Sequence, residues 1–297
     1  MQDYIDNFIS MLRNERQLSK NTLVSYRRDI EGFSFYLQKN DLQEWADVTE
    51  KHVQSYVASR FRNGLTGRSL QRALSSIRML YEYLVMHKKV STNPAKNIRA
   101  PKTITKLPAY LDVDMTEQLL NRESDNSLIV RDKAMFELFY SSGLRLSELV
   151  SINLIDLDMA EFEIRVTGKG NKTRILPVGK QAMIAIAKWL TYRSDFIKED
   201  TDALFLNRQG RRISQRSVQL RLKQWAKEQN IDMNVHPHML RHSFASHMLE
   251  GTGNIRAVQE LLGHEDISST QIYTHIDFQH LASVYDKAHP RARKNKV

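Results

Sequence analysis

The stretch STNPAKNIRAPKTITKLPAYL, residues 91–111, divides the chain into two parts. It contains three prolines and four basic residues, namely Pro94, Pro101, Pro108, Lys96, Arg99, Lys102 and Lys106. Proline interrupts helices and stiffens an extended chain, so this stretch predicts a linker. We therefore expect one domain over residues 1–92, a basic linker over 93–110 and a second domain over 111–297.

Apolar residues recur every three or four positions before this stretch, which indicates amphipathic helices. The pattern predicts four helices, over about residues 2–14, 20–39, 50–62 and 66–87. Thr49 is suited to cap the third helix, and either Thr66 or Ser69 the start of the fourth. The N-terminal part is therefore predicted to be a small four-helix domain.

The part after the stretch is predicted to be mostly helical around one small antiparallel sheet. FEIRV (162–166) and TRILPV (173–178) have the alternation of strands, and the glycine-rich turn between them indicates a β-hairpin. Helices are expected at about 180–195, 215–229, 237–250, 254–262, 268–275 and 277–287. The fold class is therefore mainly α.

The composition bounds the partner and the compartment. The 297 residues include 44 Lys and Arg against 34 Asp and Glu, a net charge of +10 that favours a polyanionic partner. No apolar run approaches the roughly 20 residues needed to span a bilayer, and the N-terminus lacks a basic secretory signal. There is no cysteine, so disulfides are excluded. We expect a cytoplasmic protein with no membrane partner and no small-molecule substrate.

Four segments of the second part contain side chains suited to phosphate chemistry. They are SGLRLSEL with Arg145, VTGKGNKTR with Lys169, HPHMLRH with His238 and Arg241, and LLGHEDISSTQIYTH with His264 and Tyr273. A tyrosine hydroxyl has a pKa of about 10 and is a poor nucleophile. It attacks phosphorus only where other groups neutralise the phosphate and manage the protons. Two arginines, a lysine and two histidines are such groups, and together they point to DNA strand exchange.

Each residue alone has a simpler interpretation. Arg145 would pair with Glu148 three positions along one helix face, and Lys169 would be a solvated turn residue. His264 would be a polar loop residue. Tyr273 would pack within a short helix that begins with a capping box of Ser268 and Gln271.

A metal site is a competing interpretation of the histidines. His236, His238, His242 and His247 lie close together in the sequence. The chain has no HExxH motif and no cysteine, so such a site would depend on histidine and carboxylate alone. We therefore expect neither a metal nor a cofactor.

The motifs SGLRLSEL, GKGNK, HPHMLRHSFASHML, LLGH and STQIYTH resemble the catalytic motifs of the tyrosine site-specific recombinases. The resemblance covers essentially the whole chain. All six catalytic positions match, at Arg145, Lys169, His238, Arg241, His264 and Tyr273. A mild departure is the acidic pair Glu265 and Asp266 beside His264.

This resemblance implies a SAM-like DNA-binding domain followed by a catalytic domain with a small sheet. It also implies that Tyr273 forms a 3′-phosphotyrosyl bond and that strand exchange passes through a Holliday junction, without metal or ATP. The basic residues Arg68, Arg72, Arg78, Lys102 and Lys106 would then contact phosphates of double-stranded DNA. A charged helix face that is only solvated is the simpler alternative.

The tail DFQHLASVYDKAHPRA (277–292) is similar to that of one branch of the bacterial Xer pair. Phe278, Leu281 and Tyr285 would form one apolar stripe that docks on a neighbouring protomer, or else packs on its own domain. The resemblance implies XerD as partner in a heterotetramer on a recombination site, FtsK as activator, and resolution of chromosome dimers at cell division.

Three other functions remain open. A type IB topoisomerase uses similar chemistry but relaxes supercoils without synapsis. A phage or transposon integrase shares all six residues and often has an additional arm-binding domain. A catalytically silent DNA-binding module is the non-enzymatic alternative, and the intact six-residue set argues against it.

Overall fold

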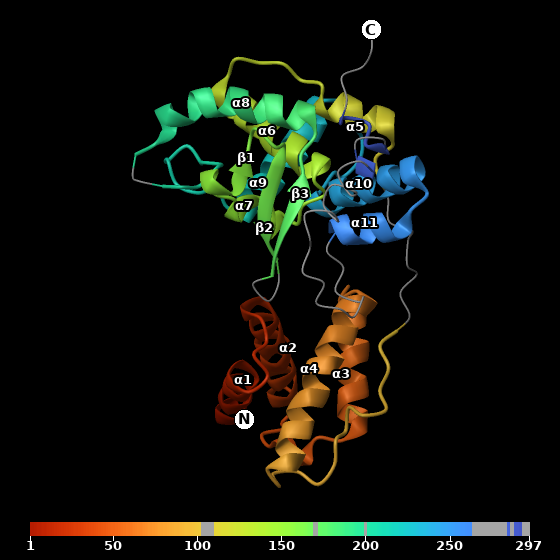
Figure 1. Ribbon diagram of the computed structural model, residues 1–297. Coiled ribbons are helices and arrows are strands. Elements are labelled where there is room, and N and C mark those ends of the chain that lie inside the picture. Colours follow the sequence, from red (N-terminus) through yellow and green to blue (C-terminus); the bar gives the residue numbers. More distant parts are fainter. Residues whose placement is uncertain (102–109, 169–171, 199–200, 263–283, 286–287, 293–297) are drawn as a thin grey trace. The chain divides into compact units, whose positions relative to one another are not determined.

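The computed structural model describes residues 1–101, 110–168, 172–198, 201–262, 284–285 and 288–292. The chain divides into two compact units, Met1–Lys106 and Leu107–Val297. Helices dominate both units, and a three-stranded sheet lies in the second (Figure 1). The predicted fold class, mainly helical with a small antiparallel sheet, is confirmed.

Four helices build the described part of the first unit: α1 (Gln2–Asn14), α2 (Lys20–Gln38), α3 (Glu50–Arg62) and α4 (Gly67–Met86). Their bounds lie within a residue or so of those expected from the apolar spacing. Thr66 rather than Ser69 begins α4, because its Oγ1 accepts a hydrogen bond from the Ser69 amide at 3.3 Å. The apolar faces meet in one core around Phe8, Phe33 and Ile77.

The segment after α4 packs against that helix. Arg78 donates from Nε to the carbonyl of Ala95 at 2.9 Å and from Nη2 to the carbonyl of Ile98. Ala95 and Ile98 are buried in the first core. The beginning of the predicted linker 93–110 therefore belongs to the first unit, because its apolar side chains reach that core. Residues 102–109 lie outside the described part, and the domain boundaries stay a prediction.

The second unit is organised around α6 (Ser127–Ser141), which packs against α8 (Lys180–Arg193) and α10 (Pro237–Thr252). Nearly all of α6 from Val130 onward is buried, so other elements surround it. A helix buried on all sides has no one-sided apolar stripe, which is why the sequence pattern does not reveal it. The remaining helices described here are α5 (Val113–Leu120), α7 (Leu146–Ser151), α9 (Gln215–Glu228) and α11 (Ile255–Leu262).

The sheet has the strand order β1-β2-β3 and is antiparallel throughout. Its strands are β1 (Leu157–Asp158), β2 (Glu163–Thr167) and β3 (Thr173–Pro177). Ile164 pairs with Leu176, and Thr167 pairs with Thr173 next to the turn. The predicted hairpin is confirmed, and β1 adds a short edge strand.

Two further expectations concern membranes and the chain end. Within the described residues no helix is both long and apolar enough to cross a bilayer. The helix expected at 268–275 lies outside the described residues. Of the helix expected at 277–287, only Val284 and Tyr285 are described, and both are helical.

Candidate active site

The turn between α6 and α7 places Arg145 at the N-cap of α7. Two residues earlier, Gly143 has a positive φ of 54°. A Cβ atom on Gly143 would lie only 2.3 Å from the ring of Phe244, on α10. Both the backbone conformation and this contact require glycine, whose lack of a side chain lets α10 approach the turn.

Arg241, three residues before Phe244 on α10, contacts the same turn. Its Nη1 donates to the carbonyl of Gly143, and its Nη2 donates to the carbonyl of Leu262 at 2.5 Å. Burial, and then the positive charge of Arg145, lower the pKa of Arg241 to about 10. The guanidinium therefore remains cationic at neutral pH, although it is half-buried near another cation.

Glu148 of α7 is a buried carboxylate between two arginines. It accepts hydrogen bonds from the amide and Nη1 of Arg145, at 2.8 and 2.9 Å. It also accepts from Nη1 and Nη2 of Arg174, on β3, at 2.9 and 3.0 Å. Burial raises the pKa of Glu148, but the hydrogen bonds from Arg174 and Arg145 outweigh it, and the pKa lies below its ordinary value. Glu148 is therefore ionised at neutral pH.

The Arg145–Glu148 pair is the simple interpretation of Arg145, and the structure confirms it. The pair does not remove Arg145 from a binding role, because the arginine side chain stays 37% exposed. Two guanidiniums thus bind one carboxylate, and a third, that of Arg241, lies near enough to interact electrostatically with Arg145 and Glu148. The excess positive charge is partly removed from water, so an anion with several oxygens would stabilise it. The arrangement is suited to a phosphodiester.

Two family models match the chain. The model described as "Phage integrase family" matches residues 109–280, and "Phage integrase, N-terminal SAM-like domain" matches residues 5–88. The chain belongs to the phage integrase family.

Relatives within the phage integrase family match nearly end to end. The chain is 50% identical over 297 residues to tyrosine recombinase XerC of Pseudomonas fluorescens, covering 100% of this chain and 99% of the relative. It is 47% identical over 292 residues to XerC of Escherichia coli O157:H7, covering 98% of each. It is therefore an XerC-like tyrosine recombinase, a DNA recombination enzyme.

Solved structures of phage integrase family members share the fold. XerH bound to its difH substrate has a TM-score of 0.69 at 22% identity, covering 94% of this chain and 82% of that one. A lambda integrase dimer bound to a core site has a TM-score of 0.70 at 17% identity, covering 92% of this chain and 99% of that one.

The structure places three of the six residues expected to be catalytic for a phage integrase family member. Arg145 and Arg241 share the Gly143 turn, and His238 is exposed in the first turn of α10, on the face of Arg241. Lys169, His264 and Tyr273 lie outside the described residues. The Gly168 amide donates to the Lys172 carbonyl at 2.8 Å, which closes the hairpin on either side of the Lys169 position.

The other histidines of the proposed metal cluster have protein partners. His236 caps α10 by accepting a hydrogen bond from the Met239 amide at 3.2 Å. His242 Nδ1 contacts the Ser246 hydroxyl at 3.2 Å, and buried His247 contacts the Tyr140 hydroxyl at 2.8 Å. No group of three metal-ligating side chains occurs among the described residues. One ring nitrogen of each of these three histidines therefore has a partner on α10 or α6.

The residues expected to contact DNA differ in their surroundings. Arg68 is exposed in the first turn of α4. Arg72 donates two hydrogen bonds to Asp29, at 2.7 and 3.1 Å. Arg78 holds the segment after α4 as described above, so its guanidinium has a structural task. Lys102 and Lys106 lie outside the described residues. DNA contact by this set stays a prediction.

Tyr285, expected in the protomer-docking stripe, is buried in its own domain. It is 1% exposed, and its hydroxyl contacts the Ser141 hydroxyl at 2.7 Å. Within the single chain this residue follows the alternative considered for the tail, because its hydroxyl contacts α6 and its ring stacks on His289 of the same tail. Phe278 and Leu281 lie outside the described residues, and their docking stays a prediction.

Arg174 is the site residue that the motifs do not single out. In TRILPV, strand alternation places Arg174 on the same side as buried Leu176. An arginine on the buried side of a strand needs a buried acidic partner, and this signal was available in the sequence.

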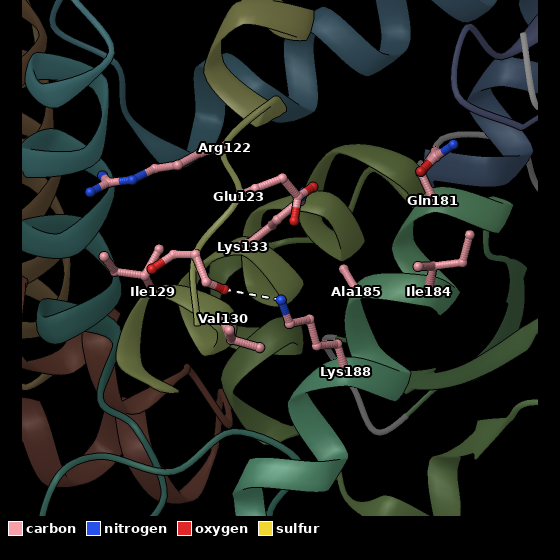
Figure 2. A pocket seen from close by; sticks show the side chains of 10 residues that line it. Arg122, Glu123, Ile129, Val130, Lys133, Gln181, Ile184, Ala185 and Lys188 are labelled. Carbon is pink, nitrogen blue, oxygen red and sulfur yellow. Dashed lines mark hydrogen bonds and ion pairs between the residues drawn. The ribbon is translucent and has the colours of Figure 1, made fainter. Parts of the chain in front are cut away.

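A separate, partly open pocket lies between the α5–α6 loop, α6 and α8 (Figure 2). Its lining is Arg122, Glu123, Ser124, Ile129, Val130, Lys133, Gln181, Ile184, Ala185 and Lys188. Lys188 donates to the Ser124 carbonyl at 3.1 Å, and Lys133 pairs with Glu123. The lining includes none of the six expected catalytic residues and its lysines are paired, so the phosphate site lies elsewhere.

Proposed function

We propose that the chain is a site-specific recombinase that cuts and rejoins DNA through Tyr273 and a Holliday junction. The main support is the attachment of Arg145 and Arg241 to one turn around Gly143, where two guanidiniums can grip one phosphate. This clamp would stabilise the negative charge that grows at phosphorus during attack.

The reaction would proceed in two balanced steps. The Tyr273 oxygen attacks phosphorus, a phosphotyrosyl bond forms, and the bond to the 5′-oxygen breaks. Lys169 supplies the proton to the leaving 5′-oxygen. The tyrosine proton passes to His238, or to solvent if His238 instead hydrogen-bonds the phosphate. His264 donates a hydrogen bond to the phosphate. A 5′-hydroxyl of the partner strand then attacks the phosphotyrosine and restores the DNA backbone.

This chemistry needs neither ATP nor a metal, because the phosphotyrosyl bond retains the energy of the phosphodiester. We therefore expect no cofactor. The residues of the clamp supply the charge stabilisation that a divalent ion supplies in other phosphoryl-transfer enzymes.

The likeness to XerC relatives at about 50% identity supports a proposal for the partners. We propose XerD as the second recombinase, two copies of each on one DNA site, and FtsK as activator. The cellular task would be the resolution of chromosome dimers at division, in the cytoplasm. The tail beyond Tyr273 would couple neighbouring protomers through Phe278 and Leu281.

The test of the nucleophile uses DNA with a nick that traps the covalent product. Tyr273→Phe should bind this DNA normally and form no adduct, while Tyr192→Phe on α8, a partly exposed tyrosine, should react like the unaltered protein. An adduct formed by the Tyr273 variant would remove that residue from the role.

Other DNA substrates separate the remaining alternatives. A type IB topoisomerase would relax supercoiled circles without pairing two sites, and a silent binding module would form no adduct at all. A phage or transposon integrase would recombine attachment sites without XerD. We expect instead that full recombination requires XerD on the same site.

A further inference from the structure

Arg174 stands apart from the six expected catalytic residues but is fixed within the same site. It comes from β3, on the hairpin that contains the Lys169 turn. Its two terminal nitrogens bind the two oxygens of Glu148, at 2.9 and 3.0 Å. Only 11% of the Arg174 side chain is exposed, so its donors are turned inward.

We propose that Arg174 is a positioning residue for strand transfer, which holds the Glu148 carboxylate so that this carboxylate fixes the guanidinium of Arg145. The proposal rests on the function proposed above and concerns the arginine clamp of that reaction. In this proposal Arg174 acts through Glu148, to which both of its terminal nitrogens donate.

The connection runs through the two oxygens of one buried carboxylate. Oε2 of Glu148 accepts from the Arg145 amide, and Oε1 accepts from Arg145 Nη1. These bonds fix the backbone and the guanidinium of Arg145 relative to α7. Each oxygen also accepts from Arg174, so the plane of the carboxylate is set from β3. Loss of Arg174 would free the carboxylate to rotate, and Arg145 would rotate with it.

The approach of the hairpin supports this arrangement. A Cβ atom built on Gly168 would lie 3.5 Å from both Arg174 Nη1 and Glu148 Oε1. The backbone at the hairpin end therefore covers the ion pair and limits its access to water. A covered bidentate pair is stronger and more rigid than an exposed one.

The charges around Glu148 give a second readout. The groups that face it are Arg145 from the α6–α7 turn, Arg174 from β3 and Arg241 from α10. Burial alone would raise the pKa of Glu148, and the hydrogen bond from Arg174 is the largest opposing influence. Without Arg174, Glu148 would take up a proton at a higher pH and would then no longer orient Arg145 as an anion.

The experiment measures the rate of adduct formation on nicked DNA. Arg174→Met should lower the rate about 10- to 100-fold while DNA affinity stays within about 2-fold, as expected when a catalytic group is misplaced. Arg174→Lys, which keeps the charge but not the two-pronged contact, should fall between. Arg165→Met, an exposed arginine on β2 of the same hairpin, should match the unaltered protein.

Two comparisons distinguish positioning from a purely structural role. A methylphosphonate at the cut site lacks one charged oxygen and needs less neutralisation. It should therefore reduce the difference in rate between Arg174→Met and the unaltered protein, and we expect the same for Arg145→Met. The acid limb of the rate against pH should also move to higher pH in Arg174→Met. The proposal would be overturned if the methylphosphonate left the rate difference unchanged and the pH below which the rate falls were the same in Arg174→Met and the unaltered protein.

A double variant shows whether slow cleavage comes from misfolding caused by an unpaired buried charge. Glu148→Gln with Arg174→Met removes both buried charges, so it should melt near the unaltered protein yet cleave as slowly as the single variant. Normal cleavage by the double variant would refute the positioning role. If the unaltered protein forms no adduct on any site, the proposed function fails first, which separates the two failures.

Discussion

Arg241 donates a hydrogen bond to the carbonyl oxygen of Gly143, two residues before Arg145 and 98 positions away in the sequence. Two like charges repel, so they cannot fix each other by direct contact. The backbone of the turn fixes them instead, one through its carbonyl and the other through its place in the chain. The spacing of the two arginines therefore depends on the conformation of Gly143.

Gly143→Ala should destabilise the catalytic unit by about 2 to 4 kcal/mol, because backbone strain and overpacking add. The added methyl would meet the Phe244 ring at 2.3 Å at a φ of 54°. Gly253→Ala, at the C-cap of α10, is the matched control, since φ is 62° but nothing lies within 4 Å. That control should cost about 1 kcal/mol. Equal losses in urea unfolding would show that the Phe244 contact is unimportant.

Lys169→Ala should cleave ordinary DNA slowly and DNA with a 5′-bridging sulfur at nearly the normal rate. A thiolate leaves without a proton, so the sulfur removes the need for a general acid, which is worth about 10²- to 10⁴-fold. Lys172→Ala, an exposed residue of the same hairpin, should react normally on both. If both substrates slow equally in Lys169→Ala, the lysine binds phosphate instead.

Adduct formation should persist in excess EDTA, because the proposed clamp is made of guanidiniums. DNA binding should weaken steeply as salt rises, since basic side chains release condensed counterions from the phosphates. The measurement is the yield of trapped adduct with and without chelator at fixed salt. Loss of cleavage in EDTA that one divalent ion restores would revive the metal interpretation.

His289 should make the protein less stable in mild acid. Burial among aromatic rings lowers its pKa to about 3, from an ordinary value of 6.5. Between these two pH values the unfolded chain therefore binds a proton at His289, whereas the folded chain does not. Stability is complete above pH 6.5 and falls as the pH drops towards 3, by about 1.4 kcal/mol per pH unit.

The check is the melting temperature between pH 7 and pH 5. At pH 5 the loss due to His289 should be about 2 kcal/mol, and His289→Phe should remove most of it while keeping the ring contacts. A slope equal to the unaltered protein in His289→Phe would contradict the assignment.

The elements that the sequence predicts well are those whose burial is one-sided. Helices α1 to α4 expose one face and bury the other, so spacing and the Thr66 cap reveal them. The spacing of apolar residues does not reveal helix α6, because this helix is buried on all sides. The end of α6 determines where the turn that contains Arg145 lies. The relative positions of Arg145 and Arg241 could therefore not be derived from periodicity.

The site shows a similar division. The motifs identify side-chain types that chemistry requires, and Arg145, His238 and Arg241 follow from them. Arg174 and Gly143 have tasks defined by neighbours far away in sequence, Glu148 and Phe244, which only packing brings close. A short apolar stripe such as that of Tyr285 predicts burial, but it does not distinguish packing on its own domain from packing on a neighbouring protomer.

The tail also holds a buried ion pair in its own domain. Arg291 donates to Glu137 from Nε at 2.9 Å and from Nη2 at 2.5 Å, and the Glu137 side chain is 1% exposed. Burial raises the pKa of Glu137, and the charge of Arg291 opposes that rise. The end of the chain therefore contributes to the fold of the catalytic unit, whatever Phe278 and Leu281 contact in an assembly.

Arg291→Met should cost about 3 to 5 kcal/mol, because it leaves a buried carboxylate without its partner. Adding Glu137→Gln should recover most of that loss, since the remaining amide carries no charge, and Arg256→Met at an exposed site of α11 should be neutral. The measurement is urea unfolding of all four proteins.

The same reasoning predicts that deleting residues 277–297 lowers the melting temperature as well as assembly with XerD. A deletion variant that melts like the intact protein would show that the tail has no stabilising role in its own domain.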